Sequence, residues 1–130
     1  MKRNTHVIGA LSFGFLSYIL YLTLEIMRFP TSSKFIISIF LNMKVITFFT
    51  IIIFSFLGGI LPDMLDPPFS SRHRKYAHSK VLFLIFFALW VLTLFSLVNN
   101  WRITVGIIFF FLSGYISHLL LDSLTPAGLY

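Results

Sequence analysis

Four long stretches without a charged residue divide this chain, and they limit its possible folds more than any other feature. A helix needs about 20 mostly apolar residues to cross the hydrocarbon core of a bilayer, and each stretch approaches or reaches that length. We therefore expect an all-α fold, a single membrane-embedded helical domain over residues 1–130 with about four transmembrane helices. The stretches run from Val7 to Leu24, from Val45 to Leu61, from Val81 to Trp101 and from Ile103 to Leu121.

The composition agrees with a multi-pass protein of the cell membrane and excludes a water-soluble domain. Hydrophobic residues make up 58% of the chain and charged residues only 11%. The chain has no cysteine, so disulfides and cysteine-based metal sites or nucleophiles are excluded. The formal charge of +6 does not indicate nucleic acid, because the basic residues lie at the ends of apolar stretches, where they meet anionic headgroups. Membrane lipid is the expected acidic partner.

Proline and glycine indicate where the second helix ends and how the helices pack. Pro62 disfavours a helical conformation in the residue before it, so we expect this helix to end at Leu61. The short apolar segment Phe35–Leu41 either extends the second helix or lies at the membrane interface. Four glycines in the second and fourth helices predict close helix contacts, namely Gly58, Gly59, Gly106 and Gly114.

Acidic residues and histidines are few and unevenly placed. The chain has four of each. With four crossings, the N-terminus, the polar segment from Leu61 to Ser79 and the C-terminus lie on one side of the membrane. All of these groups except Glu25 therefore share that side, namely His6, Asp63, Asp66, His73, His78, His118 and Asp122.

Several of these groups also have a purely structural interpretation. His118 and Asp122 lie at i and i+4 on one helix face, where they can form an intramembrane hydrogen bond. Asp63 can cap a turn, and Asp66 can shape one because two prolines follow it. His73 can belong to a basic loop that obeys the positive-inside rule.

For Glu25 and His6, each taken alone, a structural interpretation is sufficient. Glu25 with Arg28 at i+3 is typical of a helix-end ion pair, so we assign it no function. His6 can be an interfacial residue without a role. The convergence of the whole set is what favours a functional site.

Carboxylates and imidazoles from three separate segments predict a site for one or two divalent cations. Zinc takes both kinds of ligand, and manganese accepts the same set. A metal with three protein ligands keeps a water whose pKa can fall to about 7, which makes hydrolysis possible. Arg72, Arg74 and Lys75 suit a phosphate group. We expect a phosphoester substrate such as a phospholipid headgroup, with Asp66 as a candidate general base and His73 beside the phosphate-binding arginines.

The residues around this site also resemble a known family. The pattern consists of Thr5-His6, Leu61-Pro62-Asp63 with Asp66, Arg72-His73-Arg74 followed by His78-Ser79, Gly114-Tyr115-x-Ser117-His118-Leu119-Leu120-x-Asp122, and Leu124-Thr125-Pro126-x-Gly128. Over nearly the whole chain it resembles the YdjM-like family of predicted membrane-bound metal-dependent hydrolases, and more loosely the zinc-dependent phospholipase C enzymes. The resemblance implies a small inner-membrane hydrolase whose metal ligands are His6, Asp63, His78, His118 and Asp122.

Two other functions and the orientation stay open. The same ligands could form a metal-binding or metal-transport site without catalysis, although transport favours ligands near the bilayer midplane rather than at helix ends. A polar loop that only docks a partner would leave the convergence of acids and histidines unexplained. The site side carries more basic residues than the other side, so the positive-inside rule predicts that it faces the cytoplasm. The site side has Lys2, Arg3, Arg72, Arg74, Lys75 and Lys80, and the other has Arg28, Lys34, Lys44 and Arg102.

Overall fold

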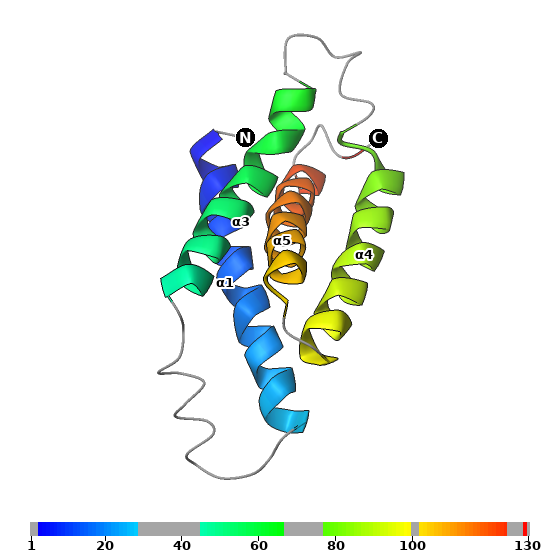
Figure 1. Cartoon of the computed structure of the whole chain (residues 1–130). Coiled ribbons are helices and arrows are strands. Elements are labelled where there is room, and N and C mark those ends of the chain that lie inside the picture. The colour runs from blue at the N-terminus through cyan, green and yellow to red at the C-terminus, as the bar shows by residue number, and fades with distance from the viewer. Residues whose placement is uncertain (1–2, 29–44, 67–76, 100–101, 125–128, 130) are drawn as a thin grey trace.

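Four helices make up the described part of the chain, which comprises residues 3–28, 45–66, 77–99, 102–124 and 129 of the computed structural model. All four are long and apolar enough to cross a membrane, which confirms the predicted all-α membrane bundle. They alternate in direction, so that the start of α1, the end of α3, the start of α4 and the end of α5 lie at one end of the bundle (Figure 1). The helices are α1 (Arg3–Arg28), α3 (Val45–Leu65), α4 (Lys80–Asn99) and α5 (Ile103–Ser123).

Among the helix boundaries that differ from the sequence-based expectation, the start of α1 and the end of α3 matter for the residues predicted to form a site. The first helix begins at Arg3, so His6 lies inside α1 rather than before it. The end predicted at Leu61 is wrong, because α3 continues through Pro62 to Leu65. A proline inside a helix removes one backbone N–H, but the Asp66 N–H donates to the Pro62 carbonyl at 2.9 Å and completes another turn. The segment at residues 35–41 lies outside the described residues.

Helix α5 lies at the centre of the bundle. It packs against α1, α3 and α4, and Figure 1 shows it between α3 and α4. Almost every residue from Phe109 to Leu119 is buried. Helix α4, by contrast, exposes large apolar side chains such as Leu84 and Leu92, as expected for a helix that faces lipid acyl chains.

Small residues bring the backbones of α3 and α5 into direct contact. A Cβ atom on Gly58 would overlap the Phe111 carbonyl oxygen, and one on Gly114 would overlap the Ser55 carbonyl oxygen. Such close approach is a common way for membrane helices to associate, because burial of apolar surface drives association little where lipid is equally apolar. The predicted close contacts at Gly58 and Gly114 are confirmed.

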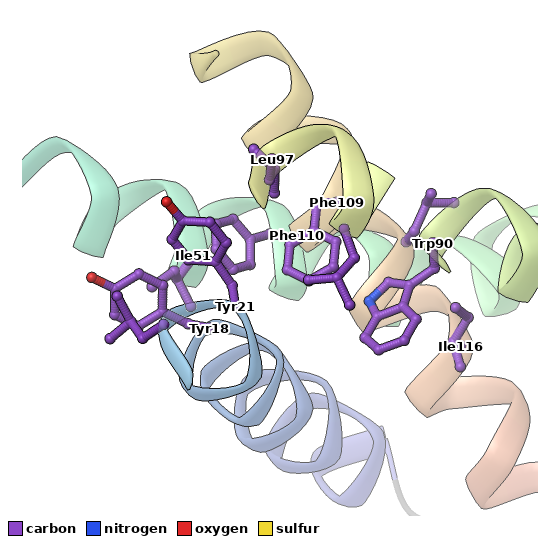
Figure 2. Packing of buried hydrophobic residues seen from close by; sticks show 11 residues of the cluster. Tyr18, Tyr21, Ile51, Trp90, Leu97, Phe109, Phe110 and Ile116 are labelled. Atoms are coloured by element: carbon purple, nitrogen blue, oxygen red, sulfur yellow. The ribbon is translucent and has the colours of Figure 1, made fainter. Parts of the chain in front are cut away.

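Aromatic side chains fill the interior away from the common end of the bundle. Trp90 stacks on Phe109, with ring centroids 5.4 Å apart, and donates a 2.8 Å hydrogen bond from Nε1 to Ser113 Oγ. Phe109 meets Phe110 edge to face. We use the name aromatic core for the buried hydrophobic cluster that contains these rings and the aliphatic side chains packed with them. Figure 2 labels Tyr18 and Tyr21 of α1, Ile51 of α3, Trp90 and Leu97 of α4, and Phe109, Phe110 and Ile116 of α5.

Candidate metal centre

Acidic and imidazole side chains from all parts of the chain meet at the common end of the bundle. Of the seven groups predicted to share this side, the structure brings six together, and we call them the His/Asp cluster. His73 lies outside the described residues, as do Arg72 and Arg74. The cluster consists of His6 in α1, Asp63 in α3, Asp66 directly after α3, His78 directly before α4, and His118 and Asp122 in α5.

Three ligand-type atoms form a nearly equilateral triangle at the centre of the cluster. His78 Nε2 lies 3.3 Å from His118 Nε2, and Asp122 Oδ2 lies 3.1 Å from the first nitrogen and 3.3 Å from the second. Atoms bound at about 2.0–2.1 Å to a tetrahedral zinc ion are about 3.4 Å from one another. The triangle therefore has the size of one face of a zinc coordination shell.

Asp63 lies beside the triangle at slightly greater distances. Its Oδ1 atom lies 3.5 Å from His118 Nε2 and 3.8 Å from His78 Nε2. The Asp63 side chain is 34% exposed, whereas the side chain of Asp122 is only 10% exposed. The cluster is thus closed on the α5 side and open beside Asp63.

A backbone carbonyl of α3 fixes the tautomer of His118. His118 Nδ1 lies 2.7 Å from the Gly59 carbonyl oxygen. A carbonyl only accepts hydrogen bonds, so Nδ1 must carry the proton and donate it. The Nε2 atom is then left with a lone pair that points into the triangle, which is the arrangement that metal-binding histidines usually show.

His6 adds a further imidazole on the other side of Asp122. Its Nε2 lies 3.4 Å from Asp122 Oδ1, and its ring stacks on His118 with centroids 4.1 Å apart. Asp122 thus presents one oxygen to His6 and the other to His78 and His118. Two overlapping groups fit a metal, one of His6, His118 and Asp122 and one of Asp63, His78 and His118. The donor set therefore suits one ion or a pair of ions bridged by shared ligands.

Asp66 supports the short segment that carries His78. Its Oδ2 accepts a 2.7 Å hydrogen bond from the Ala77 N–H and lies 3.9 Å from His78 Nδ1. Tyr115 holds the same segment from α5, because its hydroxyl donates to the Ala77 carbonyl oxygen at 3.0 Å. Asp66 is therefore placed on the Nδ1 side of His78, away from the triangle. Its predicted role as general base stays a prediction.

The surroundings of His78 favour a proton on its ring when no cation is bound. Burial lowers the pKa of His78, but its contacts with Asp122 and Asp63 outweigh burial and raise that pKa to about 9. A cation that binds to Nε2 must therefore displace a proton at neutral pH. His78 Nδ1 and His6 Nδ1 are buried and have no hydrogen-bond partner among the described residues.

Two contributors to the site were not predicted from the sequence. Gly59 acts through its carbonyl, and every residue has one, so no side-chain signal identifies it. The sequence does contain an indication of Tyr115, because a hydroxyl three residues before His118 lies on the same helix face and can reach the same site. Glu25, which was expected to stay apart, lies elsewhere in α1, where the Tyr21 hydroxyl donates to it.

The fold and the cluster define a class, a multi-pass membrane protein with a buried His/Asp cluster that could hold a metal ion. Comparison with protein families narrows this class. The family model described as YdjM inner membrane protein matches residues 1–130, and the chain belongs to this family. The resemblance noted from the sequence is thereby confirmed. Comparison with curated proteins and with solved structures gives no match.

Proposed function

We propose that this chain is a membrane-bound, metal-dependent hydrolase that cleaves a phosphoester bond of a membrane lipid. The observation that carries the proposal is the triangle of His78 Nε2, His118 Nε2 and Asp122 Oδ2, open on the side of Asp63. Three tightly placed donors and one open position are typical of catalytic zinc sites, whereas structural zinc sites have four protein ligands. Zinc fits this donor set best, and manganese is the alternative.

Each residue of the cluster has a role in this proposal. His78, His118 and Asp122 would hold the ion, and His6 would offer a further imidazole beside Asp122. A bound ion would supply Lewis acidity and a water that is nucleophilic near neutral pH. Asp63 is the better-placed general base, since it is partly exposed and borders the open position, while Asp66 is engaged with Ala77.

In the proposed reaction a water oxygen forms a bond to phosphorus as the bond from phosphorus to the leaving oxygen breaks. Asp63 takes a proton from the attacking water, and this proton then passes to the leaving oxygen as the alcohol departs, which restores the Asp63 carboxylate. Arg72 and Arg74, which follow the described end of α3 in the sequence, would hold a nonbridging phosphoryl oxygen.

The position of the cluster favours a lipid substrate. Its residues belong to the start of α1, the end of α3, the segment before α4 and the end of α5, which lie together at one end of the bundle in Figure 1. A lipid headgroup lies at the depth of helix ends while its acyl chains stay in the bilayer. A metal transporter would place its ligands near the midplane. The location therefore favours an enzyme over a transporter.

We further propose that the cluster faces the cytoplasm. Six of the chain's basic residues belong to that side and four to the other by the sequence count above. A reporter fused after Tyr130 should be active in the cytoplasm. A fusion that is active only outside the cytoplasm would contradict this orientation.

The reaction is tested with purified, metal-loaded protein in liposomes. The protein is incubated with a panel of phospholipids and small phosphoesters, and the release of headgroup or phosphate is followed with and without chelator. We expect release that chelator abolishes and that Asp63→Asn lowers strongly. Glu25→Gln serves as the matched control, since it also neutralises an acid of a transmembrane helix but lies away from the cluster.

Two results would overturn the proposal. Release at full rate in the presence of chelator would exclude a metal-dependent reaction. Stoichiometric metal binding with no turnover on the whole panel would favour a metal-binding protein without catalysis.

A further inference from the structure

An apolar groove of 670 Å³ opens between α3 and α4 beside the His/Asp cluster. Its volume lies within the range of about 300–1,000 Å³ that is usual for small-molecule sites. Both helices pack on α5, which contributes the floor. The groove is lined mainly by Leu61 and Leu65 of α3, Leu82, Ile85 and Phe86 of α4, and Tyr115 of α5.

The rim of the groove faces the lipid phase. Leu65, Val81 and Ile85 are at least half exposed and lie at its edge. Leu65 and Val81 lie at the ends of helices that are long and apolar enough to span the membrane, and Ile85 lies about one turn further along α4, so the groove runs from headgroup level towards the acyl region of the bilayer. From Ser79 to Phe86, the α4 wall covers about 10 Å of depth along the helix.

One end of the groove is polar and borders the cluster. Asp66, Ala77 and Ser79 line this end. Asp66 and Tyr115 both hydrogen-bond to Ala77, which immediately precedes His78. A molecule that lies along the groove thus has its apolar part between α3 and α4 and its polar end next to His78.

We infer that this groove binds one acyl chain of a membrane glycerophospholipid, with the headgroup of that lipid at the polar end of the groove beside His78. The inference that an acyl chain binds depends only on the groove. Delivery of the lipid phosphate for cleavage rests on the proposed function. The groove contacts the acyl chain more than the headgroup, because its walls are apolar along α4 and its polar end is limited to Asp66, Ala77 and Ser79.

The test is native mass spectrometry of the full chain in detergent with dioleoyl phosphatidylglycerol. Leu82→Trp places an indole in the groove, whereas Leu84→Trp adds the same side chain to an exposed position of the same helix. We expect the lipid-bound peaks to be lost in Leu82→Trp and kept in Leu84→Trp, with unchanged metal content in both. Ile85→Trp, at the exposed rim, repeats the test if Leu82→Trp does not fold.

The outcomes separate this inference from the proposed function. Equal lipid retention in a folded, metal-containing groove variant and in the control would overturn the groove assignment even if phosphoesters are hydrolysed. Loss of lipid from Leu82→Trp would support it even if no phosphoester is cleaved. Loss of a dimer in Leu82→Trp with full lipid retention would instead assign the groove to a second copy of the chain and overturn the inference.

Discussion

The aromatic core and the His/Asp cluster share helix α5, but they differ in whether the chain completes them. In the core, Trp90 and Phe109 stack, and the one polar atom of the indole has its partner in Ser113. In the cluster, His78 Nε2, His118 Nε2 and Asp122 Oδ2 lie 3.1 to 3.3 Å from one another. The core is therefore complete as a set of packed side chains, whereas the cluster gathers atoms with lone pairs at the spacing of a coordination shell.

Both regions depend on the same close contact between α3 and α5. Gly58 and Gly114 let the two backbones touch, and the neighbouring Gly59 carbonyl reaches His118. The difference between the regions therefore lies in their side chains and not in their scaffold. Variants in one region should leave the other intact, and the following predictions test that separation.

The largest effect is expected from His118→Ala. Loss of a residue that only orients a metal ligand already costs about 10–100-fold in affinity, so loss of this central ligand should cost at least about 100-fold. Elemental analysis and metal titration of purified protein measure it, and the exposed Leu120→Ala on the same helix is the control. Full metal occupancy in His118→Ala would refute the ligand assignment.

Phe109→Ala should damage the core and spare the cluster. The side chain is fully buried, and its removal should lower the free energy of unfolding by about 3 kcal/mol, the lower end of the range for buried phenylalanines. Denaturant unfolding in detergent measures the change, with the exposed Phe95→Ala as control. If metal affinity falls in Phe109→Ala while the protein is still folded, the two regions are not independent.

The cluster alone should respond to pH between about 6.5 and 9. Because the pKa of His78 is raised to about 9, the metal-free protein gains stability from protonated His78 below pH 6.5 and loses it as pH rises through 9. Metal affinity should change in the opposite direction, rising about tenfold per pH unit up to pH 9 as the competing proton is lost. Metal titration across this range checks the slope, and a flat profile would contradict it.

The smallest effect is expected from Trp90→Phe. The variant keeps an aromatic ring but loses the hydrogen bond to Ser113 and part of the buried ring volume, which together should cost about 2 kcal/mol of unfolding free energy. Ser113 Oγ still donates to the Phe109 carbonyl oxygen at 2.8 Å, so no polar atom is stranded. Metal content should stay unchanged, and a measurable loss of metal would show that the core holds the cluster in place.

The membrane bundle could be predicted because its signal is long and simple. Uncharged stretches of helical length locate the spans, but they do not locate the helix ends. Polar residues continue a helix at the membrane surface as readily as apolar ones, so α1 begins before His6. The loss of one N–H at Pro62 was too small an effect to end α3, since the next turn is completed by Asp66.

The membership of the cluster could also be predicted, but its internal geometry could not. Alternating helix directions place the groups at one end, which is enough to bring together His6, His78 and Asp122. Asp63 lies beside Nε2 of His78, and Asp66 lies beside its Nδ1. The two positions differ by only a few ångströms, and the sequence does not define positions that finely. Backbone partners such as the Gly59 carbonyl carry no sequence signal.

The order of the cluster residues along the chain has a consequence for biosynthesis. His118 and Asp122 come last, and both are needed for the triangle, so the helices synthesised before α5 hold only an incomplete set of donors. In the proposed metal site, capture of the ion would therefore follow insertion of α5. An ion held by His6, His118 and Asp122 would link α1 to α5, so release of the metal and separation of these helices would be coupled.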